Sequence, residues 1–329
     1  MDIEIMRFDG EQADDADLAA YHRVVQSARE VDLPGAAPKS YDVVARSVRI
    51  PHPALGRAGR WVARRSGEVI AVAHAFFPDG GNAHIALAEI TVHPEARRQG
   101  IGTAFLQAVL PELRARGRRV VEGQTAAFGA GEKWAHALGA RTVNATVVQE
   151  LRVAEVDPSL WEVGVPEGYR LEAWSGAAPD DLVASYVNAK TAMYDAPRGT
   201  ADFGHPEWTV ERVRGIEAEL RRNNREQRVV AAVHEATGEV AGFTELWLPL
   251  PPGREGIQLD TAVLAAHRGH GLGVRVKARA LRDLKADGIE LDLITTGTNA
   301  DNEHMIRVNL ALGYATVRSM VEVNRTVEA

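Results

Sequence analysis

The feature that most constrains the fold is an internal repeat, of which each copy takes about half of the chain. Residues 97–102, RRQGIG, align with residues 268–273, RGHGLG, at an offset of 268 − 97 = 171. At the same offset, LRARG at 113–117 aligns with LKADG at 284–288. So long a period indicates two copies of one domain and not a solenoid of short repeats.

The boundary between the copies is expected at 154–168, AEVDPSLWEVGVPEG, which is rich in proline, glycine and acidic residues. We therefore expect an N-terminal domain over 1–153, a linker over 154–168 and a C-terminal domain over 169–329. The 329 residues are enough for two domains of ordinary size.

Both copies predict the same order of elements. A short strand and helical segments are followed by three strand-like runs, a glycine turn, a helix, a strand, a helix and a last strand. The segments SGE at 66–68 and ATGE at 236–239 predict hairpins between the second and third strands. Hairpins followed by a crossover helix are typical of an α+β fold. We expect two tandem domains, each a mixed, mostly antiparallel sheet flanked by helices.

The composition excludes several classes of function. Because the chain has no cysteine, it has no disulfide, no thiolate metal site and no cysteine nucleophile. The net charge of −7 argues against a nucleic-acid binder. The apolar runs are of strand length and the first ten residues lack a basic flank, so we expect neither a membrane span nor a signal peptide. A cytoplasmic location fits the lack of cysteine.

The two glycine turns predict a phosphate site. A strand that passes through glycines into a helix leaves backbone N–H groups unpaired at the positive end of the helix dipole. Gly271 and Gly273 would let a ligand approach the backbone because they carry no Cβ. Arg268, and Arg97 in the first copy, are expected to add a charge-assisted contact. A tight turn without a ligand is the alternative, which the repetition makes less favoured. Neither a dinucleotide fingerprint nor a P-loop fits this position.

At this point the chain resembles a known family. VHPEARRQGIGTAFL at 92–106 and VLAAHRGHGLGVRVK at 263–277 are similar to the acetyl-coenzyme A motif of the GNAT acyltransferase superfamily, Arg/Gln-x-x-Gly-x-Gly/Ala. TGTNADNEHMIRVNLALGY at 296–314 is similar to the ending of such domains. The whole chain therefore resembles a tandem GNAT protein of the kind common in actinobacteria, with the two-domain layout of the mycothiol synthases.

The resemblance implies that acetyl-CoA binds at the turns, with its pyrophosphate on the helix amides and its pantetheine arm between the fourth and fifth strands. It also implies that a strand-four amide, near Val92 or Val263, polarises the thioester carbonyl. The residues expected to bind the coenzyme are, in the first copy, Val92, Arg97, Arg98, Gln99, Gly100, Ile101, Gly102 and Thr103, and, in the second copy, Val263, Leu264, Arg268, Gly269, His270, Gly271, Leu272, Gly273, Val274, Asn299, Asn302 and Met305.

Asparagines distinguish the two copies. Only the second copy has Asn299, Asn302 and Asn309 after its fifth strand, at a spacing that places them on one helix face. In the family, asparagines here bind the coenzyme or the substrate. The alternative is an N-cap for Asn299 and plain surface for the other two. We expect the C-terminal domain to be catalytic and the N-terminal domain to be degenerate.

The candidates for the general base are Glu89 and Asp260, which match each other because 260 − 89 = 171. Strand alternation would place them on the same face of both copies, and a solvated carboxylate is the alternative for each. Asn309 stands where many family members carry a tyrosine general acid, and it is the third catalytic candidate. That departure leaves the acid unassigned, because Tyr314 is expected in the core.

The histidines of the second turn, His267 and His270, are interpreted as loop residues with a possible coenzyme contact. Their spacing of three, without a further ligand cluster, argues against a metal site.

The acceptor is expected against the segment 188–208, in which acidic and aromatic side chains would suit a cationic amine. Its proposed wall consists of Met193, Tyr194, Asp195 and Trp208, with His205 nearby. Domain packing by Met193 and Trp208 is the alternative.

The predicted function is acetyl transfer from acetyl-CoA to a primary amine of a small molecule by direct attack. A non-catalytic coenzyme A sensor or scaffold is the other hypothesis. We expect no nucleic-acid or membrane partner, and a monomer or homodimer.

Overall fold

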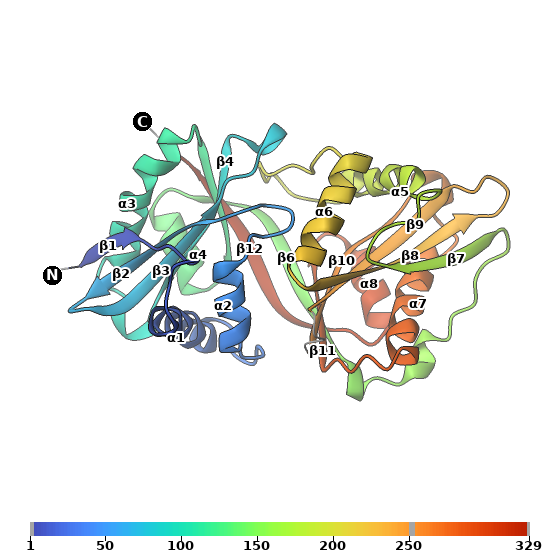
Figure 1. The fold of residues 1–329 in the computed structure, drawn as a ribbon, viewed down its shortest axis with the longest axis horizontal. Coiled ribbons are helices and arrows are strands. Elements are labelled where there is room, and N and C mark those ends of the chain that lie inside the picture. The colour runs from blue at the N-terminus through green and yellow to red at the C-terminus, as the bar shows by residue number, and fades with distance from the viewer. Residues whose placement is uncertain (1–2, 250–253, 328–329) are drawn as a thin grey trace. The chain divides into compact units, whose positions relative to one another are not determined.

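The computed structural model describes residues 3–249 and 254–327, and the chain forms two compact units. Unit 1 contains Met1–Ala145, Gly199–Pro206 and Met320–Ala329, and unit 2 contains Thr146–Arg198 and Glu207–Ser319. Among the described residues, no helix has the length and apolar character needed to cross a membrane. Most helices and strands of both units are labelled in Figure 1.

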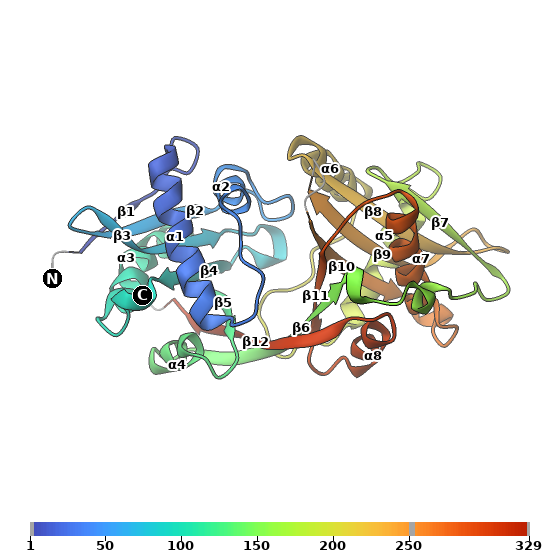
Figure 2. The same cartoon turned by 90° about the horizontal axis from the view of Figure 1, so that it is seen from below.

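Unit 1 is a sheet in the order β1-β2-β3-β4-β5-β12 with helices on both faces. Helices α1 and α2 pack on β2 and β3 from one face, as Figure 2 shows for α1, and α3 packs on the other face. The elements are β1 (Glu4–Arg7), α1 (Asp15–Asp32), α2 (Tyr41–Arg49), β2 (Gly59–Arg65), β3 (Glu68–Phe76), η1 (Gly80–Asn82), β4 (Ile85–Val92), η2 (Pro94–Ala96), α3 (Ile101–Ala115), β5 (Val120–Ala126), α4 (Ala130–Ala137) and the later part of β12 (Ala315–Thr326).

Unit 2 repeats this arrangement in the strand order β6-β11-β10-β9-β8-β7. Its elements are β6 (Arg141–Arg152, of which residues from 146 lie here), η3 (Val153–Glu155), η4 (Pro158–Trp161), β7 (Tyr169–Ser175), α5 (Val183–Lys190), η5 (Thr191–Asp195), α6 (Val210–Arg222), β8 (Arg225–His234), β9 (Val240–Pro249), β10 (Glu255–Val263), η6 (Ala265–His267), α7 (Leu272–Ala286), β11 (Leu293–Asn299) and α8 (Glu303–Ala311).

The predicted fold class is confirmed, since each sheet is mostly antiparallel and the parallel pairs follow crossover helices. The first predicted hairpin is present: Arg65 pairs with Glu68 across a turn in which Ser66 and Gly67 have φ of 49° and 84°. Positive φ at both central positions is the conformation that matches the twist of a two-residue hairpin. The second hairpin joins β8 to β9, where Val233 pairs with Val240.

The last strand of each repeat lies in the other unit. In unit 1, β12 pairs with β5 from Met320 opposite Ala126 to Thr326 opposite Val120. In unit 2, β6 pairs with β11 over the registers from Thr146 to Arg152. The compact units therefore differ from the contiguous ranges 1–153 and 169–329 that the repeat predicts, because each sheet is completed by a strand from the other copy. The segment 154–168 is also packed, with Trp161 buried among the side chains of unit 2.

The parallel pair in each sheet separates towards its carboxyl end. The β10–β11 pairing covers only the registers from Glu255 to Ile257, and the β4–β5 pairing covers only those from Ile85 to Leu87. The β10–β9 register then shifts between Gln258 and Thr261. Such a bulge re-aims side chains next to it. The parallel pairing thus ends before each glycine turn, although in unit 1 the backbones stay close at least as far as Ala88, whose O would lie 2.5 Å from a Cβ at Gly123.

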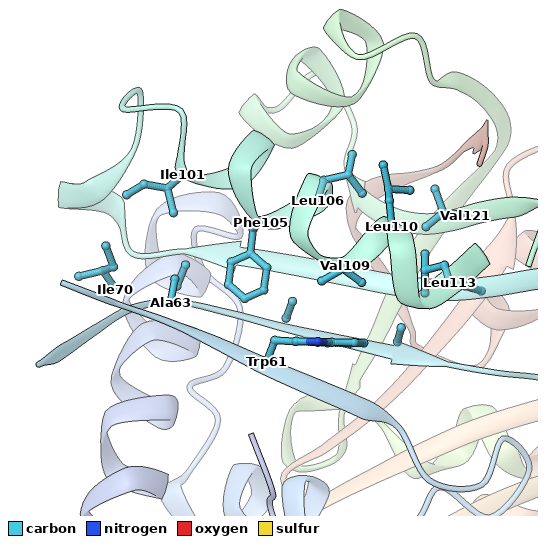
Figure 3. Packing of buried hydrophobic residues seen from close by; sticks show 14 of the residues in the cluster. Trp61, Ala63, Ile70, Ile101, Phe105, Leu106, Val109, Leu110, Leu113 and Val121 are labelled. Carbon is cyan, nitrogen blue, oxygen red and sulfur yellow. The ribbon is translucent and has the colours of Figure 1, made fainter. Parts of the chain in front are cut away.

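The core of unit 1 is built on α3 (Figure 3). Phe105, Val109 and Leu113 recur every four residues, so they lie on one face of the helix, and all three are buried. They pack on Trp61 and Ala63 of β2. This packing fixes the helix axis and therefore the direction in which its N-terminal amides point.

Candidate active site

In unit 2, the glycine turn brings the chain from β10 into α7 through left-handed backbone. Gly269 and Gly271 have φ of 87° and 65°, and Gly271 is the N-cap of α7 with no side chain bonded to the first turn. The first-turn amides of a helix have no partner within it. A Cβ added at Gly273 would meet nothing within 4 Å, so the backbone there is open to a ligand.

The matching turn in unit 1 has the same backbone but a different neighbour. Gly100 has φ of 77° and is the N-cap of α3. A Cβ added at Gly102 would lie 3.4 Å from the indole of Trp134, whose Nε1 donates to Thr103 Oγ1 at 3.2 Å. The indole therefore lies against the first turn of α3, where a phosphate would have to approach. At the N-cap glycines the two turns differ in the opposite sense, since a Cβ at Gly100 would meet nothing within 4 Å and one at Gly271 would lie 2.1 Å from Arg275 Nη1.

The two arginines of the motif hold the turns. Arg97 Nε donates to Val92 O at 3.1 Å, and its Nη atoms bind both carboxylate oxygens of Asp32 at 2.7 Å. Arg268 Nε donates to Val263 O at 3.1 Å, and Nη2 donates to Asp195 at 2.7 Å. Both guanidinium groups have these partners in the structure, while the phosphate contact predicted for them stays a prediction.

The other predicted coenzyme residues divide by exposure. The side chains of Ile101 and Leu272 are buried in the cores, so only their backbone can face a ligand, and Val274 packs at the edge of a core. The amide of Leu264 donates to Ala241 O at 2.9 Å and is not free. The exposed members are Arg98, Gln99 and His270, with Gln99 accepting from Arg65 at 2.8 Å.

The histidines of the turn take part in an aromatic cluster. His267 Nδ1 lies 2.9 Å from the Tyr169 hydroxyl, and its Nε2 lies 3.2 Å from Glu239. The rings of His234 and His270 lie 5.4 and 5.5 Å from that of Tyr169. Across the described part of the chain, no group of three or more possible ligands could hold a metal ion. The cluster ties η6 to β7 and to the β8–β9 turn.

Asp260 lies in the β10 bulge and belongs to a charged cluster. Lys190 Nζ lies 2.6 Å from Glu245 Oε1 and 3.7 Å from Asp260 Oδ2. The hydroxyl of Tyr186 also donates to Glu245. Burial, together with the like charge of Glu245, raises the pKa of Asp260 to about 6, and Lys190 opposes this rise. Its side chain keeps 34% exposure, so the carboxylate still reaches the surface.

In unit 1, Glu89 lies opposite His74 in the β3–β4 register and accepts from Thr91 at 3.1 Å. Burial lowers the pKa of His74, and the nearby Glu89 opposes that effect. His74 matches Glu245 because 245 − 74 = 171. Glu89 thus has a histidine where Asp260 has a second carboxylate and a lysine.

The three asparagines do not share one role. Asn299 accepts from Asp301 N at 2.8 Å, and Asn302 caps α8 by accepting from Met305 N at 3.1 Å. Asn309 is fully buried, and its Nδ2 donates to Gln149 at 2.8 Å. The helix cap is therefore Asn302 and not Asn299, and Asn309 is part of the interior. These contacts give Asn309 a structural role, and its side chain has no exposed surface.

Tyr314 is in the core, as expected: it is buried in unit 2, and burial raises the pKa of its hydroxyl.

Some residues of the predicted acceptor wall already have partners within the protein. Trp208 lies over Lys190, with Nζ 4.1 Å from its ring centroid, and Asp195 pairs with Arg268. Met193 packs on the unit 2 core, while Tyr194 is 45% exposed. His205 lies in unit 1 and so is not grouped with the others. Two of the wall residues therefore already contact cations of the protein itself, Trp208 with Lys190 and Asp195 with Arg268. Lys190 was not among the predicted site residues, because nothing in the local sequence indicates that this lysine is buried.

Comparison with known proteins gives consistent results. The Acetyltransferase (GNAT) family matches residues 36–138 and 191–314. The mycothiol acetyltransferase of Nocardia farcinica is 29% identical over 315 residues, which cover 94% of this chain and 92% of that protein. The mycothiol acetyltransferase of Clavibacter michiganensis subsp. michiganensis is 31% identical over 258 residues, 71% of this chain and 70% of that protein.

Two solved structures are similar over almost the whole chain. A tandem GNAT protein from the clavulanic acid biosynthesis pathway has a TM-score of 0.81 at 27% identity and covers 100% of this chain and 99% of that chain. A GCN5-related N-acetyltransferase from Sphaerobacter thermophilus has a TM-score of 0.78 at 17% identity, with coverage of 99% and 96%, which shows the fold alone.

Proposed function

The chain belongs to the GNAT acetyltransferase family, and we propose that its C-terminal repeat moves the acetyl group of acetyl-CoA to a primary amine of a small molecule, with Asp260 as the general base. Members of the family generally use acetyl-CoA. The observation that carries the assignment to this repeat is the pairing of an open glycine turn with a partly exposed carboxylate on the strand that leads into it.

The residues of unit 2 fit the coenzyme. The left-handed Gly271 and the uncovered Gly273 lie at the positively polarised N-terminus of α7, whose first-turn amides suit a diphosphate. The divergence of β10 and β11 after Ile257 leaves strand amides for the pantetheine arm. When bound, acetyl-CoA supplies an acetyl group activated as a thioester.

Asp260 has the properties of a base at neutral pH. With its pKa raised to about 6, the carboxylate is mostly ionised at pH 7 and still a better proton acceptor than an ordinary aspartate. The nearby Lys190 and Glu245 offset each other's charge, so one negative charge remains at Asp260. That charge attracts an ammonium ion from solvent, which gives one proton to the carboxylate. The neutral amine then attacks the thioester carbonyl, and the C–S bond breaks as the second amine proton passes to the leaving thiolate.

The acceptor is proposed by class only. The relatives named mycothiol acetyltransferase support a small-molecule amine, and the exposed Tyr194 offers an apolar contact beside the site. The general acid, the oligomeric state and the cytoplasmic location stay predictions. In unit 1, Trp134 against Gly102 supports a repeat that does not bind the coenzyme.

The test is a thiol-release assay on Asp260→Asn and Glu89→Gln with acetyl-CoA and a panel of small amines. Because the protein has no cysteine, a thiol reagent reports only released coenzyme A. Loss of the base should lower the rate by about 100-fold or more in Asp260→Asn, while Glu89→Gln stays near the wild-type rate. A larger loss in Glu89→Gln would assign the reaction to unit 1. Coenzyme binding without thiol release from any amine would favour the scaffold hypothesis.

A further inference from the structure

Lys190 is a lysine buried inside unit 2, at the last residue of α5. It is 2% exposed, and its Nζ is surrounded by the rings of Trp208, Phe243 and Tyr186, at 4.1, 5.0 and 5.4 Å from their centroids. A lysine is almost never fully buried unless it is paired. The pairing here is with two carboxylates on neighbouring strands, Glu245 on β9 and Asp260 on β10.

The two carboxylates are not equivalent. Glu245 is the close partner at 2.6 Å, its side chain is 8% exposed, and it also accepts from Tyr186 and from Gln227 Nε2 at 3.4 Å. Asp260 lies 3.7 Å from Nζ and its side chain is 34% exposed. Glu245 therefore acts as the fixed counterion of Lys190, whereas Asp260 has one side towards the lysine and the other towards the surface.

The position of Lys190 beside both carboxylates affects whether Asp260 can act as a base. Two carboxylates that face one buried space without a cation cannot both stay ionised, so one of them takes up a proton. A protonated Asp260 cannot accept the proton of an amine. The lysine between them removes this conflict, while the Asp260 side chain keeps 34% of its surface exposed.

We propose that Lys190 is a positioning residue for the acetyl transfer, which fixes the Asp260 carboxylate in the β10 bulge and keeps it ionised by sharing its charge between Asp260 and Glu245. The inference rests on the proposed function in taking Asp260 as the base. The remaining titratable groups of the cluster are Tyr186, which donates to Glu245, and Glu217 of α6, which is paired with Arg214.

The experiment follows the carboxyl resonance of Asp260 by ¹³C NMR in protein labelled at aspartate, with Asp260→Asn to assign the signal. It needs no acceptor and no coenzyme. Lys190→Gln should move the Asp260 titration to higher pH, and Glu245→Gln should move it to lower pH, each by about one pH unit or more. Damage to the fold alone would not produce shifts of opposite sign.

Two further variants keep the test decisive if Lys190→Gln folds poorly because Glu245 is left without its cation. Lys190→Arg keeps the charge and should titrate near the wild type. Lys190→Gln/Glu245→Gln removes the buried pair together, and its Asp260 should titrate between the two single variants. An Asp260 titration that is unchanged in Lys190→Gln overturns the inference, and so does one that is the same in the double variant as in Glu245→Gln.

The proposed function can fail separately. If Asp260→Asn keeps full thiol-release activity while the NMR shifts occur as expected, then Lys190 tunes a carboxylate that is not the base. If Asp260→Asn is inactive, the acid limb of the pH–rate profile should move to higher pH in Lys190→Gln and to lower pH in Glu245→Gln.

Discussion

Replacing Gly271 with alanine tests the geometry of the coenzyme turn directly. The residue has φ of 65°, and an L-residue in left-handed backbone costs about 1–2 kcal/mol. The new Cβ would lie 2.1 Å from Arg275 Nη1, so that side chain must move. It would give up its bonds to Gly271 O at 2.9 Å and Gly164 O at 2.6 Å, each about 0.5–1.5 kcal/mol. The total cost is roughly 2–5 kcal/mol.

Gly100→Ala in unit 1 is the matched control. Gly100 has φ of 77°, but a Cβ there would meet nothing within 4 Å, so only the backbone cost of about 1–2 kcal/mol remains. Thermal unfolding measures the stability of both variants. Each kcal/mol that is lost should lower the melting temperature by about 2–4 °C in a unit of this size. Calorimetry with acetyl-CoA should show weakened binding for Gly271→Ala and little change for Gly100→Ala.

Arg275→Ala separates the clash from the backbone strain. Since Gly271→Ala already displaces Arg275, adding Arg275→Ala should cost less than it does in the wild type, which is a non-additive double-mutant cycle. Equal destabilisation by Gly271→Ala and Gly100→Ala, together with an additive cycle, would refute the geometric argument. Coenzyme affinity lost only in Gly100→Ala would place the cofactor in unit 1.

Two further predictions follow from buried titratable groups. Because the base must be ionised and the pKa of Asp260 is about 6, kcat/KM should fall about tenfold per pH unit below pH 6; a flat profile down to pH 5 would count against it. Burial lowers the pKa of Lys277 to about 7, so the unfolded chain binds its proton up to a higher pH and stability should rise with pH above 7. Lys277→Met should stabilise the fold by roughly 2 kcal/mol or more at pH 6, in urea titrations, and less at pH 9; destabilisation at pH 6 would contradict the assignment.

Much of the fold could be predicted because local chemistry determines it. The SGE and ATGE turns select hairpins, and the glycines after the fourth strand select a left-handed entry into a helix. The glycines of the repeated LRARG and LKADG segments, Gly117 and Gly288, have φ of 72° and 68° and follow the ends of α3 and α7, as is typical of glycine after a helix. Tyr314 was correctly expected in the core, where it packs in unit 2 between α8 and β12 in the chain.

The site was harder to predict, because its contacts join residues far apart in the sequence. Glu89 and Asp260 were found from the repeat, but nothing local indicates that Lys190 lies beside Asp260, seventy residues later (260 − 190 = 70). The bond from Arg268 to Asp195 and the position of Trp134 against Gly102 depend in the same way on tertiary packing. Asparagine is ambiguous locally, since it serves as a cap at Asn302 and as an interior donor at Asn309.

The pairing of β5 with β12 has a consequence for biosynthesis. By the time β5 is made, about 190 residues separate it from the strand that covers its open edge (315 − 126 = 189). During that interval an unpaired strand edge is a template for association with other chains. A nascent chain that stops before Ala315 would keep that edge exposed, so quality control of this protein should depend on how quickly the ribosome finishes the second repeat.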